Sequence, residues 1–240
     1  MRRVVVAFAI YVAVQGSFAA WRWHVWSYGA DTGTFAQIAS NAFAGFYNTS
    51  ERGSHFAVHW SPILVTLYPL AALTHGGLAL QVAQIVLVGG AAFPFYAFVR
   101  PYVAGGVAAT LAIVALAYPP LVAVAFDEFH EIAFYPILVF ALLWAIDANR
   151  RALSIAFAVL LVLVREEALL VVAAVGVALA LAALRSPASE PRGLLFFEPR
   201  EPAPSLALGV ALAATSLVVF AAYFGIVAPS LGGWTASHFY

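Results

Sequence analysis

More than half of the acidic residues in this 240-residue chain lie in three short stretches between long apolar segments. The stretches are Asp31, the run Asp127-Glu128-Phe129-His130-Glu131 and the run Arg165-Glu166-Glu167. An unpaired carboxylate is costly to bury in an apolar medium. Charges in such a chain therefore tend to mark a functional site or the membrane surface. If the fold brings the three stretches to one side, they would form a single polar site.

Asp31 is the candidate catalytic residue, with the role of a general base. A helix is expected to begin at Asp31 or Thr32, and the positive end of a helix dipole stabilises a carboxylate. Such a carboxylate can take the proton from an attacking hydroxyl group. The structural alternative is a simple helix N-cap, which contributes about 1 kcal/mol to stability.

The run from Asp127 to Glu131 is the candidate metal site. If the run is helical, Asp127 and Glu131 share one face and repel each other, so a cation, a shared proton or an arginine should compensate them. Carboxylates with histidine suit Mn²⁺ or Zn²⁺, and carboxylates alone suit Mg²⁺. The candidate ligands for a divalent cation, Mg²⁺ or Mn²⁺, are Asp127, Glu128, His130 and Glu131. The alternative is a solvated loop at the membrane surface.

A second group of residues has the chemistry to bind phosphate or another part of a substrate. Arginine binds phosphate through two parallel hydrogen bonds, and a histidine can donate a hydrogen bond to it. The candidates are Arg165, Arg52, His55, His59, Glu166 and Glu167. Two alternatives remain: Arg165 can instead pair with the acidic residues near it, and the two histidines can be ordinary interfacial residues.

The composition is that of a polytopic membrane protein. Hydrophobic residues make up 64% of the chain and charged residues 9%, whereas soluble domains contain about 25% charged residues. The formal net charge is zero, so no basic surface is available for nucleic acid. Cysteine is absent, which excludes disulfides, thiolate catalysis and cysteine-ligated metals.

The apolar segments predict an all-α fold, a single membrane domain over residues 1–240. A membrane-spanning helix needs about 20 apolar residues. The candidate segments are 4–20, 57–74, 78–99, 103–122, 133–148, 152–164, 168–184 and 206–228. The 57–74 segment contains His59, Ser61, Pro62 and Pro69. We expect it to lie along or dip into the outer surface, which leaves a bundle of about seven transmembrane helices.

The distribution of arginine predicts the orientation of the bundle, because cytoplasmic loops are rich in basic residues. If 57–74 does not cross the membrane, the N-terminus and most arginines are cytoplasmic: Arg2, Arg3, Arg100, Arg150, Arg151, Arg185, Arg192 and Arg200. Only Arg22, Arg52 and Arg165 then lie outside. The same orientation places all three acidic stretches, with His55 and His59, on the outer face.

Two connecting segments have distinct patterns. The first outer loop, residues 21–56, contains an amphipathic helix that we expect to lie on the outer surface. Its apolar residues recur at helical spacing: Phe35, Ile38, Ala39, Ala42, Phe43 and Phe46. The 185–205 segment is rich in proline with glutamate or serine before it, which predicts a flexible cytoplasmic loop.

Several motifs in this order resemble the DUF2079 family of bacterial membrane proteins, which is grouped with the GT-C superfamily of membrane glycosyltransferases. The similarity covers most of residues 20–185. It is carried by Tyr28-Gly29-Ala30-Asp31-Thr32-Gly33-Thr34-Phe35-Ala36-Gln37, His55-Phe56, His59-Trp60-Ser61-Pro62-Ile63-Leu64, Phe126-Asp127-Glu128-Phe129-His130-Glu131 and Val164-Arg165-Glu166-Glu167.

The resemblance implies a GT-C-like bundle in the bacterial plasma membrane. It implies an inverting sugar transfer from a polyprenyl-phosphate donor at the extracytoplasmic face, with Asp31 as the catalytic base by its position. Two alternatives stay open. One is a non-catalytic membrane protein that handles or transports lipid, and the other is a truncated, inactive GT-C relative.

Overall fold

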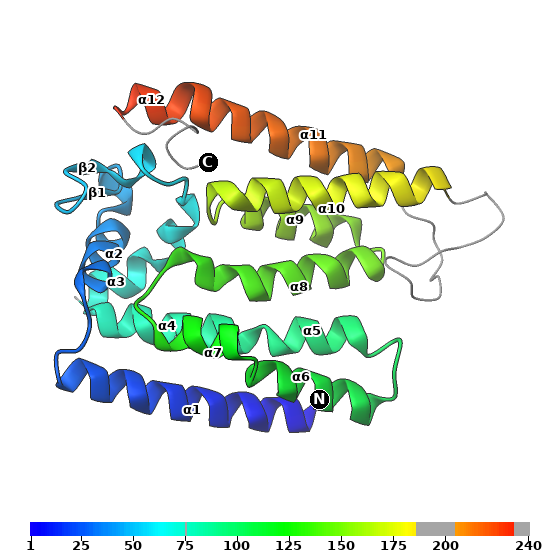
Figure 1. The fold of residues 1–240 in the computed structure, drawn as a ribbon, viewed down its shortest axis with the longest axis horizontal. Coiled ribbons are helices and arrows are strands. Elements are labelled where there is room, and N and C mark those ends of the chain that lie inside the picture. Colours follow the sequence, from blue (N-terminus) through cyan, green and yellow to red (C-terminus); the bar gives the residue numbers. More distant parts are fainter. Residues whose placement is uncertain (75, 186–204, 233–240) are drawn as a thin grey trace.

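The computed structural model describes residues 1–74, 76–185 and 205–232, and these are mostly helical (Figure 1). The α-helices are α1 (Arg2–His24), α2 (Ala30–Ser40), α3 (Tyr68–Thr74), α4 (Gly77–Gly90), α5 (Ala92–Val99), α6 (Gly105–Leu116), α7 (Pro119–Phe126), α8 (Phe134–Asp147), α9 (Arg151–Val162), α10 (Glu166–Arg185), α11 (Leu206–Ala222) and α12 (Ala228–Ser230). Strands β1 (Tyr47–Asn48) and β2 (Gly53–Ser54) form a short antiparallel hairpin.

Four helical segments in the described residues are long and apolar enough to cross a membrane. They are α1, α4 with α5, α10, and α11 with its continuation to Ser230. A fifth is present if α6 and α7, which are bent by 48°, count as one span. The bend falls just before Pro119 and Pro120, because proline cannot continue a preceding helix. The protein is therefore multi-pass, with four or five candidate spans.

The predicted count of about seven spans is not reached, because α8 and α9 are too short. They contain 14 and 12 residues, fewer than the roughly 17 that a span needs. Two hydrogen bonds from another segment lie at the end of α9: Trp60 Nε1 donates to the Val162 carbonyl, and Ile63 N donates to the Leu163 carbonyl. The last carbonyls of this helix are thus satisfied within the bundle.

Close packing of small residues joins the last two long helices. A Cβ atom added to Gly176 of α10 would lie 2.5 Å from the Ala213 nitrogen and 2.6 Å from the Gly209 oxygen of α11. Both helices can approach this closely only because glycine lacks a side chain. Small residues at such an interface are typical of membrane helices.

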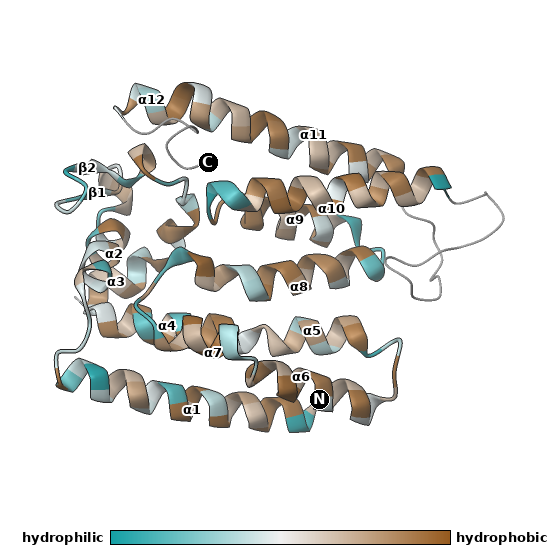
Figure 2. Ribbon diagram, in the orientation of Figure 1, coloured by the Kyte–Doolittle hydropathy of each residue, from teal (hydrophilic) through white to brown (hydrophobic). Residues whose placement is uncertain are grey.

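The helices run side by side, so the loops collect at two ends of the bundle (Figure 1). One end, called here the N-terminal end, contains the start of α1, the α5–α6 and α8–α9 turns and the end of α10. The other, called here the site end, contains residues 25–74, 127–133 and 163–166. Figure 2 shows mostly apolar helices, with hydrophilic residues concentrated towards these ends.

The first long loop forms a cap of short elements over the site end. Helix α2 forms within the predicted amphipathic segment and buries Phe35, Ile38 and Ala39 against the core, but it ends at Ser40, and Phe43 beyond it is 76% exposed. Residues Pro62–Thr74 form two short helices at this end and are too short to span a membrane. Most of the predicted flexible loop, residues 186–204, lies outside the described residues.

Candidate functional site

Asp31 and His130 form an exposed pair at the site end, called here the exposed pair. His130 Nε2 lies 3.5 Å from Asp31 Oδ2, and the side chain of Asp31 is 59% exposed. Asp31 lies in the first turn of α2, one residue inside the helix start. The ring of Phe35, one turn further along, contacts the His130 ring edge-on at 5.1 Å. This pair brings two of the three predicted acidic stretches together.

Glu128 caps helix α2, and it does so from a distant part of the chain. Its carboxylate accepts hydrogen bonds from Gly29 N and Thr32 N, both at 2.8 Å, and from the Thr32 hydroxyl at 3.2 Å. The prediction that Asp31 or Thr32 caps this helix is therefore wrong, because the cap residue is Gly29 and the capping carboxylate belongs to Glu128. An anion at a helix N-terminus also interacts favourably with the dipole.

Two buried glutamines of α4 hold the 127–131 run in an extended path. Gln84 Nε2 donates to the carbonyls of Val124, Asp127 and Glu128, and its Oε1 accepts from His130 N. Gln81 Nε2 donates to the Asp127 carbonyl. The expectation of a helical face shared by both ends of the run is wrong, because α7 ends at Phe126 and these glutamines satisfy the backbone instead.

Arg165 lies at the centre of a second group, called here the buried cluster, with Glu131, Glu166, Glu167 and His59. Its guanidinium lies 3.3 Å from Glu131 Oε1, 3.7 Å from Glu166 Oε1 and 3.0 Å from Glu167 Oε2. Glu131 and Glu166 are 0% and 1% exposed. Burial lowers the pKa of Arg165, but the three carboxylates more than offset this, so its pKa lies above the usual value.

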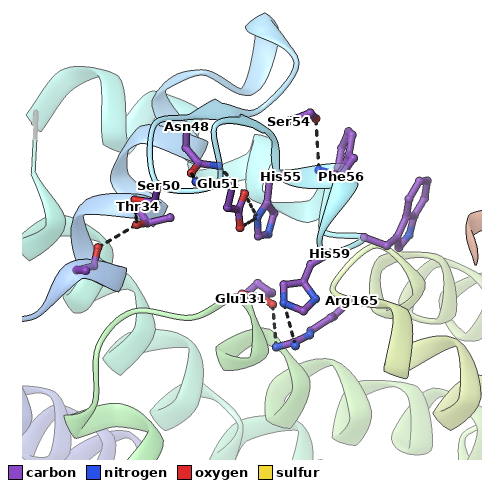
Figure 3. Close-up of polar contacts among 12 residues, drawn as sticks. Thr34, Asn48, Ser50, Glu51, Ser54, His55, Phe56, His59, Glu131 and Arg165 are labelled. Atoms are coloured by element: carbon purple, nitrogen blue, oxygen red, sulfur yellow. Dashed lines mark hydrogen bonds and ion pairs between the residues drawn. The ribbon is translucent and has the colours of Figure 1, made fainter. Parts of the chain in front are cut away.

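His59 links the buried cluster to the first loop. Arg165 Nη2 contacts His59 Nε2 at 3.2 Å (Figure 3). His59 Nδ1 lies 2.8 Å from Glu166 Oε1. A guanidinium group can only donate hydrogen bonds, so His59 Nε2 accepts from Arg165. His59 Nδ1 then carries the ring hydrogen and donates a hydrogen bond to Glu166. The other Glu166 oxygen accepts from Trp60 N at 2.9 Å. Together with the Arg165–Glu131 pair, these contacts join three chain segments that are far apart in sequence.

Glu51 and His55 form a further pair beside the buried cluster (Figure 3). His55 is 1% exposed, and its Nδ1 lies 2.9 Å and 3.0 Å from the two Glu51 oxygens. Burial raises the pKa of Glu51, but hydrogen bonds from His55 and Asn48 outweigh this and hold its pKa below the ordinary value. His55 therefore has a carboxylate partner of its own, which the sequence did not indicate.

Aromatic contacts connect the exposed pair to the buried cluster. The Phe35 ring lies 5.7 Å from the His55 ring and 5.1 Å from the His130 ring, and His55 lies 5.6 Å from His59. All three acidic stretches thus meet at one end of the bundle. Arg52 lies apart, exposed at the turn between β1 and β2, where its φ is +56°.

The four candidate metal ligands point to different partners. Glu128 caps α2, Glu131 faces Arg165, and His130 faces Asp31. Asp127 accepts a hydrogen bond from the backbone of the next residue. Within the described ranges, no three histidine or acidic side chains lie close enough together to hold a metal ion. Any cation at this end would need ligands beyond these four side chains.

The fold and the site together define a multi-pass helical membrane protein whose three acidic stretches converge at one end of the bundle. No curated protein and no solved structure matches the chain. A family model described as a predicted membrane protein (DUF2079) matches residues 23–239. The chain therefore belongs to the DUF2079 family, as the sequence motifs predicted.

Proposed function

We propose that the protein is a glycosyltransferase of the GT-C kind. It moves a sugar from a polyprenyl-phosphate donor to an acceptor hydroxyl at the extracytoplasmic face of the bacterial plasma membrane. The observation that carries the proposal is the exposed pair, in which a solvent-accessible carboxylate lies 3.5 Å from a histidine at the end of the apolar bundle. Its position at a helix end rather than in the bundle centre differs from the midplane sites of transporters.

Asp31 has the position and exposure of a general base. The acceptor hydroxyl oxygen attacks the anomeric carbon, and its proton passes to the Asp31 carboxylate. The bond between the anomeric carbon and the phosphate oxygen breaks, and its electron pair leaves with the phosphate. A single displacement of this kind inverts the anomeric centre. His130 orients the carboxylate and stabilises its charge before the proton arrives.

The leaving phosphate needs positive charge. Three carboxylates surround Arg165, so much of its charge is already compensated. Arg52 forms no ion pair or hydrogen bond within the described part of the chain, and its exposed position leaves it available to the phosphate. A divalent cation is the other candidate. Asp31 and His130 would hold Mn²⁺, which accepts a carboxylate with a histidine, and phosphate oxygens and water would complete its shell.

Substitution of Asp31 tests the proposal directly. Purified protein in bilayers is mixed with polyprenyl-phosphate hexoses and a membrane extract that supplies acceptors, with and without Mg²⁺ or Mn²⁺. We expect Asp31→Asn to lower transfer by about 10²- to 10⁴-fold, with insertion and thermal stability unchanged. Asp147→Asn, at the N-terminal end of the bundle, is the matched control and should retain transfer.

Two outcomes would contradict the proposal at different levels. Full activity in Asp31→Asn would remove the base assignment while leaving the reaction class intact. A wild-type protein that transfers no sugar from any donor would instead favour a non-catalytic lipid-handling role or an inactive relative.

A further inference from the structure

The backbone at the end of α1 has an unusual residue for its conformation. Ser27 N donates to the Arg22 carbonyl at 3.0 Å, and Trp26 N lies 3.3 Å from the Trp23 carbonyl. This pattern is a Schellman turn, in which the left-handed position usually contains glycine. Here that position is Trp26, with a φ of +55°. A bulky residue in this region is a conformational outlier.

Packing within the described protein does not offset the strain at Trp26. Trp26 is 90% exposed, so it buries little apolar area that could compensate for the strained φ angle. Strained residues of this kind persist where function requires the side chain, and they are over-represented at binding sites. The exposed indole ring therefore points to a ligand outside the fold.

A cavity lies directly beside Trp26. Its volume is about 370 Å³, within the roughly 300–1,000 Å³ that is typical of small-molecule sites. Its lining includes Trp23, Trp26, Tyr28, Thr32, Gly33 and Gly77. None of the described lining residues carries a charge. Thr32 directly follows Asp31 in the first turn of α2, so the cavity lies beside the helix turn that carries Asp31.

The aromatic wall of this cavity is held in place before any ligand arrives. The Tyr28 ring lies 6.1 Å from the Trp23 ring. The Arg22 guanidinium lies over the Tyr28 ring, 4.2 Å from its centroid. Arg22 also donates to the carbonyls of Ser27 and Phe126, which ties the end of α1 to α7. A preorganised wall lowers the entropic cost of binding.

We infer that this cavity binds one sugar ring. A pyranose has a flat face of C–H groups, which can stack on the exposed Trp26 ring, and a rim of hydroxyls. Mostly aromatic walls with a few polar groups suit such an amphipathic ligand. An uncharged lining does not suit a phosphate. The choice of a sugar rests on the proposed function, and the cavity would hold the ring beside the turn of α2 that carries Asp31.

The competing role for these tryptophans is an aromatic belt at the membrane surface. The two roles predict opposite effects of Trp26→Gly. If the ring serves a ligand, glycine relieves the strained φ, and the thermal midpoint stays equal or rises while sugar binding falls. If the ring serves only the membrane or the fold, glycine lowers the midpoint or membrane insertion and leaves sugar binding unchanged.

Binding is measured on the full chain in detergent by saturation-transfer NMR, with methyl glycosides of glucose, galactose, mannose and N-acetylglucosamine as probes. We expect Trp26→Gly to weaken the affinity for the preferred glycoside by about tenfold, equivalent to 1.4 kcal/mol. Trp26→Phe keeps an aromatic ring and should stay within about threefold of wild type. Trp21→Ala is the matched control: Trp21 is 58% exposed near the end of α1 but does not line the cavity.

The inference is overturned if wild type binds none of the glycosides or if Trp26→Gly binds them as well as wild type does. Failure of the proposed function looks different. A wild-type protein that binds a glycoside through Trp26 but transfers no sugar supports the cavity and contradicts the transferase. Asp31→Asn should still bind the glycoside, because the Asp31 carboxylate does not line the cavity.

Discussion

The exposed pair and the buried cluster lie at the same end of the bundle, yet they differ in every physical respect. Asp31 is mostly exposed, and its one ionisable partner among the described residues is His130, at 3.5 Å. Arg165 faces three carboxylates, and two of these, Glu131 and Glu166, are almost fully buried. The first arrangement leaves a carboxylate accessible to substrate. The second encloses its charges and joins separate segments.

Under the proposed function, the difference separates residues that carry chemistry from residues that position them. Buried charges are tolerated when they are paired, and removing one partner is then strongly destabilising. The buried cluster joins His59 and Trp60, the 127–131 run and the start of α10. It therefore fixes the positions of the segments against which α2, with Asp31, packs. Substitutions in the two groups should therefore affect stability and activity in opposite proportions.

Arg165→Met should give the largest loss of stability. It leaves Glu131 and Glu166 buried without a cation, and breaking a buried pair in this way costs about 3–5 kcal/mol. The free energy of unfolding, from denaturant or thermal unfolding in detergent, measures the loss. Removal of the Glu131 charge as well, in Arg165→Met/Glu131→Gln, should recover part of it.

The exposed Arg52 provides the control for Arg165. Arg52→Met removes the same charge from the hairpin turn and should change stability by less than about 0.5 kcal/mol. Equal losses for the two arginines would show that the buried cluster contributes no more than a surface charge does.

Glu128→Ala should give the next largest loss. It removes the carboxylate that accepts from Gly29 N and Thr32 N, and loss of a helix cap costs about 0.5–2 kcal/mol. Since α2 carries Asp31, we also expect sugar transfer to fall. Asp127→Ala is the control, because Asp127 caps no helix start at this site. A Glu128→Ala protein with unchanged stability would contradict the capping role.

The Glu51–His55 pair should make stability depend on acidity. The pKa of Glu51 is lowered in the folded protein, so its contribution is present above its ordinary value of 4.5 and is lost as the pH falls through the lower folded value. Glu51→Gln should cost about 1 kcal/mol at neutral pH. The difference in thermal midpoint between wild type and Glu51→Gln should shrink as the pH is lowered below 4.5. A difference that is constant with pH would contradict the pairing.

The sequence predicted the features that depend on composition and on arginine counting. These include the helical membrane fold, the position of Pro62–Thr74 outside the spans, and the gathering of the acidic stretches at one end. The buried face of α2 was predicted because its apolar residues follow helical spacing. The roles assigned to Asp31 and the other site residues remain predictions.

Most of the features that the sequence did not predict depend on long-range partners; the Glu51–His55 pair, four residues apart, is a local exception. The cap on α2 comes from Glu128, and the partners of Gln81 and Gln84 are backbone carbonyls of a distant segment. Such pairs have no local pattern, although two glutamines three residues apart in an apolar helix were a signal of buried polar contacts. The count of about seven spans is not confirmed in the described residues, because α8 and α9 have only 14 and 12 residues.

Asp31→Asn should change stability least. Its contact with His130 is long and exposed to solvent, and exposed ion pairs contribute about 0–1 kcal/mol. We expect a change in unfolding free energy below about 0.5 kcal/mol, measured beside Arg165→Met under the same conditions. Sugar transfer should nevertheless be lost in Asp31→Asn. If Asp31→Asn instead destabilised the protein as much as Arg165→Met, the distinction between an accessible reactive group and an enclosed structural one would fail, because both groups would then be part of the same frame.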